Sequence, residues 1–284
     1  MTGTETHLRV RDYGLAATLN SGQAFRWRKD GNGWTGVIGK HWVQLTQMHD
    51  GIRAETAAPV ADWKWLRDYL RTEVNLAAVL KTFPDDKPMR AAVTACCGLR
   101  ILRQAPWECL ASFILSSTKQ IVQIRQIIAL LCERFGELVV VPPGEPPAFV
   151  FPSPTKIARA TEAELRACKM GFRAPHLLAT ARQIAGGKFD LNRLRHLPLT
   201  EAREELMELR GVGGKIADCV LLFAYGFDAA FPVDVWVGRA LRELYFPRRH
   251  VTAKRLHYFA ATHFGLRAGY AQQYLFHYMR TKVK

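Results

Sequence analysis

The chain has 284 residues, of which 49% are hydrophobic and 11% aromatic. This composition excludes an intrinsically disordered chain, because burying that much apolar surface offsets the conformational entropy lost on folding. The 40 Lys and Arg residues outnumber the 25 Asp and Glu residues, and the formal net charge of +15 favours a polyanionic partner, nucleic acid above all.

Neither membrane insertion nor secretion is indicated. No apolar stretch approaches the length of about 20 residues that a membrane-spanning helix needs. The segment from Met1 to Val10 is polar and of mixed charge, unlike a secretory signal. No cysteine pair has CxxC spacing, so we expect reduced thiols, mostly in the core, at Cys96, Cys97, Cys109, Cys132, Cys168 and Cys219.

The first part of the chain predicts an antiparallel sheet. From residue 8 to about 57, β-forming residues alternate between turn signals such as Asp30-Gly31-Asn32-Gly33 and Asp50-Gly51. The expected strands are 7–10, 23–28, 34–38, 41–47 and 51–55.

From Pro59 onward the apolar residues recur at helical spacing, first in two short segments from Trp63 to Leu70 and from Leu76 to Leu80. Further helices are expected at 88–97, 106–115, 118–135, 154–158, 161–169, 174–186, 200–209, 214–225, 235–245, 252–263 and 268–281. The Pro-rich stretch 141–154 is expected to run over the surface between helical groups.

The predicted fold class is therefore α+β, with an N-terminal antiparallel β-sheet domain followed by two mostly α-helical lobes. We expect residues 1–100 to form the sheet domain with its helices, and residues 101–284 to form a helical domain. A helix-hairpin-helix motif is expected at about 200–225, and the C-terminal helix is expected to pack back near the N-terminal domain.

The hairpin segment, 209–224, is the most informative part of the chain. The first helix of the motif is expected to begin near Thr200, which is suited to cap it. Three glycines follow this helix, Gly211, Gly213 and Gly214, and a second helical pattern begins after them. Glycines at the start of a helix leave backbone N–H groups uncovered, so a phosphate could dock there. An ordinary corner between two tightly packed helices fits the same spacing.

Lys215 lies on the first turn of this second helix, with Cys219 on the same face one turn later. The eight residues 226–233 reach far enough for Asp234 to return to the lysine. A lysine beside a carboxylate is a sufficient pair for Schiff-base chemistry, because the amine attacks and the carboxylate stabilises cationic intermediates. Asp234 is also expected to cap a helix, a role compatible with staying ionised.

The motif Leu-x-Gly-Val-Gly-x-Lys, followed nineteen residues after the lysine by the aspartate of Pro-Val-Asp, resembles the helix-hairpin-helix DNA glycosylase superfamily. More narrowly, the chain is similar to 8-oxoguanine DNA glycosylase/AP lyases. The resemblance extends in family order to the segments 21–27, 102–117, 171–174 and 268–276.

This resemblance implies an enzyme that turns 8-oxoguanine out of duplex DNA, excises it and cleaves the strand by β-elimination. Lys215 would be the nucleophile, Asp234 would stabilise the sugar cation, and Cys219 would be a wall of the base pocket or a plain core residue. The Gly22 carbonyl would accept a hydrogen bond from N7–H of 8-oxoguanine, which guanine lacks. Gln272 would read the Watson–Crick edge of the base, and Phe276 would stack on it.

Other matching residues would bind the DNA around the lesion. Phe172 would fill the vacated stack and Arg173 would read the orphaned base. The hairpin glycines Gly211 and Gly213 would hold phosphate, with Arg239, Arg242 and Lys254 as weaker phosphate candidates.

The sequence departs from the family pattern at several of these positions. Thr118-Lys119-Gln120 replaces an Asn run and Gln123 replaces an Arg, so we expect less preference for cytosine opposite the lesion. Trp236 stands where a phosphate-contacting His is often found, and Phe223 takes a pocket-wall position that can hold Met.

Two alternatives stay open. One is a related glycosylase for another damaged base, although the chain lacks the C-terminal four-cysteine cluster of the iron–sulfur branches. The other is a non-catalytic helix-hairpin-helix module that only holds DNA, which would explain the hairpin and charge but not Asp234.

The expected partner is double-stranded DNA containing 8-oxoguanine, bound by a monomer. We expect the protein inside the cell and associated with DNA, in the cytoplasm or nucleoid if it is bacterial and in the nucleus if it is eukaryotic. No membrane partner, metal or organic cofactor is expected, apart from a structural monovalent cation that the hairpin carbonyls could hold.

Overall fold

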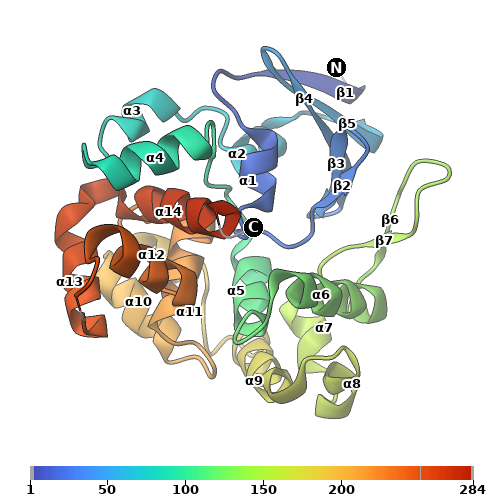
Figure 1. The fold of residues 1–284 in the computed structure, drawn as a ribbon. Helices are drawn as coiled ribbons and strands as arrows, with labels where there is room; N and C mark the ends of the chain where they lie inside the picture. The colour runs from blue at the N-terminus through green and yellow to red at the C-terminus, as the bar shows by residue number, and fades with distance from the viewer. Residues whose placement is uncertain (1–2, 250, 283–284) are drawn as a thin grey trace.

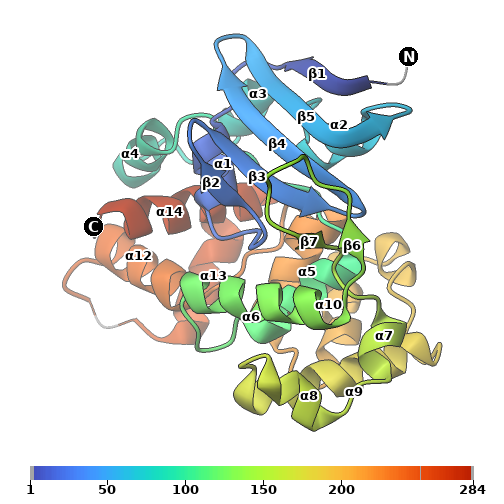
Figure 2. The ribbon, with the colours of Figure 1, turned by 90° about the vertical axis from the view of Figure 1, so that its right-hand side faces the viewer.

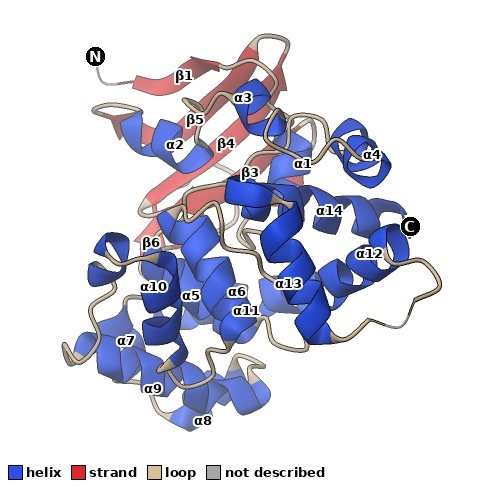
Figure 3. Ribbon diagram, turned by 90° about the vertical axis from the view of Figure 1, so that its left-hand side faces the viewer, coloured by secondary structure: helices blue, strands red, loops and turns tan. Residues whose placement is uncertain are grey.

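The computed structural model describes residues 3–249 and 251–282, so the ends of the two predicted domains, 1–2 and 283–284, lie outside the described residues. A five-stranded antiparallel sheet stands on one side and a larger group of helices on the other (Figures 1 and 3). This confirms the predicted α+β class. Within the described ranges, no helix is long and apolar enough to cross a membrane.

The sheet has the strand order β1-β5-β4-β3-β2. Its strands are β1 (Gly3–Arg9), β2 (Arg28–Asp30), β3 (Gly33–Ile38), β4 (His41–Met48) and β5 (Gly51–Val60). Asp30 pairs with Gly33 and Met48 pairs with Gly51, which confirms tight hairpins at both predicted turn signals.

The predicted strand at 23–28 is wrong, because β2 begins only at Arg28. The buried Gln23 side chain donates Nε2–H to the carbonyls of Thr18 and Arg100, at 3.0 and 2.7 Å, and its Oε1 accepts from Leu102 N–H at 2.8 Å. These contacts hold the segment as a loop against distant parts of the chain. The short helix α1 (Leu15–Asn20), which the sequence analysis missed, precedes it.

The helices after the sheet lie at the predicted places, with ends shifted by a few residues. They are α2 (Lys64–Leu70), α3 (Leu76–Leu80), α4 (Lys87–Ala95), α5 (Pro106–Leu115), α6 (Ile121–Phe135), α7 (Pro154–Ala158), α8 (Glu162–Ala167), α9 (Ala174–Ala185), α10 (Leu199–Met207), α11 (Gly214–Val220), α12 (Val235–Tyr245), α13 (Ala253–His263) and α14 (Ala268–Lys282). Short 3₁₀ turns lie at Gly171–Arg173, Arg193–His196 and Gly265–Arg267.

Two helix starts differ from the prediction. Helix α6 begins at Ile121 rather than at 118, because Thr118 has a φ of 53° in the left-handed region and cannot continue a right-handed helix. Helix α10 is preceded by Pro198, so Thr200 lies inside the helix and does not cap it.

The Pro-rich stretch forms a small hairpin on the surface. Strands β6 (Leu138–Val139) and β7 (Ala148–Phe149) pair, and the loop between them extends toward the sheet (Figure 2). An ion pair of 3.3 Å between Arg28 and Glu145 joins this loop to β2.

Helix α14 packs against the N-terminal part of the chain. Tyr274 Oη donates to the Leu99 carbonyl at 2.9 Å, and Gln273 Nε2 donates to the Ser21 carbonyl at 2.9 Å. Figure 1 shows α14 between α4 and α12, beside the loop that follows α1. The C-terminal helix and the loop containing Gly22 therefore meet at one place.

Helix α11 ends in an unusual turn. Leu221–Tyr225 form a π-helical turn, closed by Gly226 in the left-handed region at φ 81°. The Phe223 carbonyl accepts the Gln104 N–H at 2.8 Å, which ties this turn to the segment before α5. Single π turns are frequent at functional sites.

Candidate active site

A cavity of about 410 Å³ lies where α5, α6, α11, α12 and α14 meet the loop containing Gly22. It brings together the residues predicted to act on the sugar and the base. The predicted residues that line it are Gly22, Lys215, Cys219, Phe223, Asp234, Trp236, Gln272 and Phe276.

Lys215 follows directly on the N-terminal glycine of α11, and its side chain reaches into the cavity. Its Nζ donates to Ser116 Oγ at 3.4 Å and lies 5.3 Å from the centroid of the Phe113 ring. One long hydrogen bond and one aromatic face hold the amine loosely. It therefore stays available to a reacting carbon.

Asp234 caps α12, as predicted. Its Oδ1 accepts the Val237 N–H at 2.8 Å. Burial raises the pKa of the Asp234 carboxyl, while the backbone N–H groups and Lys215 oppose that rise. Among the ion pairs of the described residues, none joins Asp234 to Lys215. The carboxylate therefore acts on the lysine across the cavity, as an electrostatic partner.

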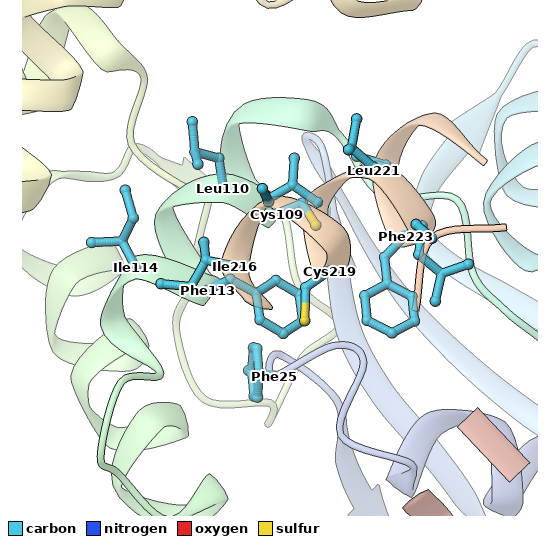
Figure 4. Close-up of a cluster of buried hydrophobic side chains, with 14 of the residues drawn as sticks. Phe25, Cys109, Leu110, Phe113, Ile114, Ile216, Cys219, Leu221 and Phe223 are labelled. Atoms are coloured by element: carbon cyan, nitrogen blue, oxygen red, sulfur yellow. The ribbon is translucent and has the colours of Figure 1, made fainter. Parts of the chain in front are cut away.

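Cys219 and Phe223 form the wall beside the lysine. Figure 4 shows them with Phe25 and Phe113 in one buried cluster, drawn from the loop, α5 and the α11 region. The Phe113 and Phe223 rings stack with centroids 5.6 Å apart. Burial raises the pKa of the Cys219 thiol to about 12, so it remains neutral and acts as apolar surface.

Gly22 is a position that favours glycine. Its φ is +79°, and an added Cβ would lie 2.8 Å from Ile121 Cδ1. Across the cavity, Gln272 is buried, and its Oε1 has no hydrogen-bond partner among the described residues. Phe276 follows one helical turn later and lines the same cavity. A flat ring entering here would meet unpaired polar groups at its edge and an aromatic face beside it.

Several cavity residues were not assigned a role at the base or sugar from the sequence. Ser116, Lys119 and Gln120 line the side formed by α5 and the loop after it, and Arg280 lines the side formed by α14. Arg280 is four residues after Phe276, so its place on the same helix face was a usable signal.

Phe172 and Arg173 lie outside the cavity lining, beside the loop after α5, with Phe172 on the surface and Arg173 beneath it. Phe172 is 54% exposed, and the Arg173 guanidinium lies 4.2 Å from the centroid of its ring. Arg173 itself is buried and donates to the Ser117 carbonyl, to Thr118 Oγ1 at 2.6 Å and to the Met170 carbonyl at 3.2 Å. The aromatic ring is accessible, whereas most of the guanidinium donors are occupied.

The remaining predicted DNA-binding residues are also outside the cavity lining. Gln123 Oε1 accepts the Gln120 N–H at 3.2 Å and so completes the cap of α6. Gly211 has a φ of +84° and packs against His176, while Gly213 is exposed at the N-terminus of α11. Arg239 is exposed and pairs with Glu243 at 2.5 Å.

A larger cavity, of about 720 Å³, lies between the sheet and α6 and shares Phe25 with the first. Arg26, which lines this cavity, pairs with the partly exposed Glu108 at 3.3 Å and also donates to the Phe149 carbonyl. Burial raises the pKa of the Glu108 carboxyl, and Arg26 opposes that rise. The lysine of this larger cavity, Lys29, is exposed on β2, whereas Lys215 lines the smaller cavity together with Asp234, so we take the smaller cavity as the candidate active site.

Two family models match the chain. Residues 7–110 match the N-terminal domain of 8-oxoguanine DNA glycosylase, and residues 111–261 match the HhH-GPD superfamily of base excision DNA repair proteins.

Relatives and solved structures agree with this match. The N-glycosylase/DNA lyase of Saccharomyces cerevisiae is 33% identical over 258 residues, which cover 81% of this chain and 68% of the yeast protein. The structure of MBOgg1 in complex with a low affinity DNA ligand is 32% identical, with a TM-score of 0.94 over 100% of this chain and 98% of that one. The Clostridium acetobutylicum 8-oxoguanine glycosylase/lyase, in complex with double-stranded DNA containing cytosine opposite 8-oxoguanine, is 29% identical, with a TM-score of 0.91 over 98% of this chain and 99% of that one.

Proposed function

Because the chain belongs to the HhH-GPD superfamily of base excision DNA repair proteins and carries the N-terminal domain of 8-oxoguanine DNA glycosylases, we propose that it excises 8-oxoguanine from duplex DNA and then cleaves the strand. The observation that carries the proposal is one cavity that holds a loosely bound amine, a partly buried carboxylate and an unpaired acceptor on the base-reading Gln272. The partner is double-stranded DNA. Every group the proposal needs comes from one chain, which supports a monomer.

The reaction begins when the damaged nucleotide leaves the base stack and its base enters the cavity. The Lys215 amine attacks C1′ of the sugar, forming an Nζ–C1′ bond. The glycosidic C1′–N9 bond breaks, and its electron pair leaves with the base. Asp234 stabilises the positive charge that develops on the sugar and accepts the lysine proton. Its raised pKa suits a group that takes up a proton.

Strand cleavage follows from the same lysine. The amine attached to C1′ opens the sugar ring to a Schiff base, which makes the C2′ proton acidic. Loss of that proton expels the 3′ phosphate by β-elimination, with the C3′–O bond electrons leaving on the phosphate. Hydrolysis of the Schiff base then frees Lys215.

Recognition of the base rests on the other cavity residues. The Gly22 carbonyl accepts N7–H, the hydrogen that 8-oxoguanine has and guanine lacks. Gln272 pairs with the Watson–Crick edge, and its buried Oε1 gains the partner that it lacks in the protein alone. Phe276 and the neutral Cys219 cover the two faces of the ring.

The surface around the cavity suits a bent duplex. The exposed Phe172 ring fills the gap left by the flipped base, and the uncovered N–H groups at Gly213 and Gly211 bind phosphate at the start of α11. The net charge of +15 supplies the sequence-independent attraction to DNA. The hairpin carbonyls are our proposed site for a monovalent cation.

The test is borohydride trapping on duplexes that carry 8-oxoguanine opposite each of the four bases. We expect a covalent adduct with the wild-type protein and none with Lys215→Gln. Lys119→Gln is the matched control, since Lys119 lines the same cavity and should retain trapping. If the 8-oxoguanine duplexes give no adduct and a duplex with another damaged base does, that other base is the substrate. DNA binding without any adduct would indicate a non-catalytic module.

A further inference from the structure

Arg280 is a cavity residue with no role in the proposed reaction. It lies one helical turn after Phe276 on α14, and its guanidinium carbon is 5.3 Å from the centroid of the Phe276 ring. The side chain therefore runs along the same face as the stacking residue and lines the cavity.

The Arg280 guanidinium has a buried N–H group without an acceptor. Nη1 is inaccessible to solvent and has no hydrogen-bond partner, and Arg280 takes part in none of the ion pairs of the described residues. Burial lowers the pKa of the guanidinium, with Asp234 favouring the charge and Arg125 disfavouring it. An arginine stays protonated in proteins, so the cost of the unsatisfied donor remains until a ligand supplies an oxygen.

The position of Nη1 relative to Gly22 suggests which oxygen that is. An added Cβ on Gly22 would lie 3.2 Å from Arg280 Nη1 and 3.2 Å from Phe276 Cε1. The unpaired donor is therefore a direct neighbour of the glycine whose carbonyl we assign to N7–H. Because Nη1 is inaccessible to solvent, it suits an atom of an inserted base better than a phosphate of the DNA backbone, which stays hydrated.

Oxidation changes guanine at two adjacent positions. N7 loses its acceptor character and gains a hydrogen, and C8–H becomes C8=O, a hydrogen-bond acceptor. An acceptor and a donor held side by side in the protein match both changes at once. Guanine would leave the Arg280 N–H unpaired, and a buried polar group left unpaired is the strongest form of rejection.

We propose that Arg280 is a specificity residue that donates a hydrogen bond to O8 of the flipped 8-oxoguanine, beside the Gly22 carbonyl that accepts N7–H. This assignment rests on the proposed function. It gives the enzyme two polar contacts that distinguish the lesion from guanine.

The experiment measures equilibrium binding in the Lys215→Gln background, where no base is released. Three duplexes are compared, with 8-oxoguanine, guanine or a tetrahydrofuran abasic analogue at the same position. Arg280→Met should lower the affinity for the 8-oxoguanine duplex by about 10-fold or more, the usual effect of losing a charge-assisted hydrogen bond. The affinity for the abasic duplex should fall far less, because that duplex has no O8.

The control is Lys282→Met, which removes the same charge from an exposed position of the same helix. It should affect the three duplexes equally. Arg280→Lys keeps a donor and should recover part of the preference for 8-oxoguanine. Thermal unfolding of each variant shows whether α14 is still folded, and Arg280→Lys provides the test if Arg280→Met is not.

Other results would overturn the assignment. Equal losses on the 8-oxoguanine and abasic duplexes would place Arg280 on a phosphate or on Asp234. An unchanged preference for 8-oxoguanine over guanine would show that Arg280 does not read the base. Failure of the proposed function looks different: the Lys215→Gln protein with Arg280 intact would show no preference for 8-oxoguanine over guanine, and both proposals would fall.

Discussion

The contacts of Arg173 predict weak discrimination of the base opposite the lesion. A guanidinium has five N–H donors. Four of the Arg173 donations are directed at the Ser117 carbonyl, Thr118 Oγ1 and the Met170 carbonyl. Gln123, where the resembling family has an arginine, uses its Oε1 to cap α6 and offers only the two N–H donors of its amide in place of the five of a guanidinium. The surface that would face an estranged cytosine therefore has few donors to offer.

The expected magnitude comes from this count. A good bidentate pair discriminates a base by about 1 to 3 kcal/mol, or roughly 5- to 150-fold. With about one donor of Arg173 still free, we expect excision of 8-oxoguanine opposite the four bases to differ by less than about 10-fold.

The assay is single-turnover excision of 8-oxoguanine opposite cytosine, thymine, guanine and adenine. The perturbation is the double variant Thr118→Asn with Gln123→Arg, which adds an amide and a guanidinium beside the orphaned base and should raise the preference for cytosine. Gln126→Arg is the control, because it adds the same charge at an exposed position of α6. A wild-type preference for cytosine above about 10-fold, or a double variant no more selective than Gln126→Arg, would refute the reasoning.

Three further predictions concern the cavity itself. Because burial raises the pKa of Asp234, the rate of base excision should fall as the pH is lowered, with a midpoint above the pKa of about 4 of an ordinary carboxyl. Asp234→Asn should remove this fall of the rate at acid pH, and a fall that persists in the variant would assign it to another group. Gly22→Ala and Gly144→Ala should each lose about 1 to 2 kcal/mol of unfolding free energy in urea, since both glycines have positive φ. Only Gly22→Ala should lose excision, because nothing crowds a Cβ at residue 144. Iodoacetamide at neutral pH should modify the exposed Cys97 and spare Cys219, as read by mass spectrometry; rapid modification of Cys219 would contradict its buried, neutral state.

The helices were predictable because their periodicity is local. The failure at 23–28 has the opposite origin: the alternation there looks like a strand, but the buried Gln23 amide bonds to Arg100 and Leu102, about 80 positions away. A local sequence pattern cannot indicate a contact between residues so far apart in the chain. The late start of α6 has a similar cause, since Thr118 gives no sign of its positive φ.

The candidate site divides in the same way. Lys215 and Asp234 were recognisable from the glycine-rich hairpin and the capping position, and the cavity brings them together. Arg280 was missed because an arginine near the end of a helix is ordinary, and only the packing of α14 against the Gly22 loop buries its Nη1. The occupied donors of Arg173 likewise depend on a loop that is distant in sequence.

The π-helical turn at Leu221–Tyr225 constrains how the protein can evolve. It holds one residue more per turn than an α-helix would, within the nineteen positions that separate Lys215 from Asp234. Deleting a single residue there would restore an ordinary turn and shift the residues within the turn by one position around the helix. The ring of Phe223 would leave the cavity, and its carbonyl would lose the Gln104 N–H. In this segment natural selection must therefore preserve the number of residues as strictly as their identity, and insertions and deletions among functional descendants should fall elsewhere.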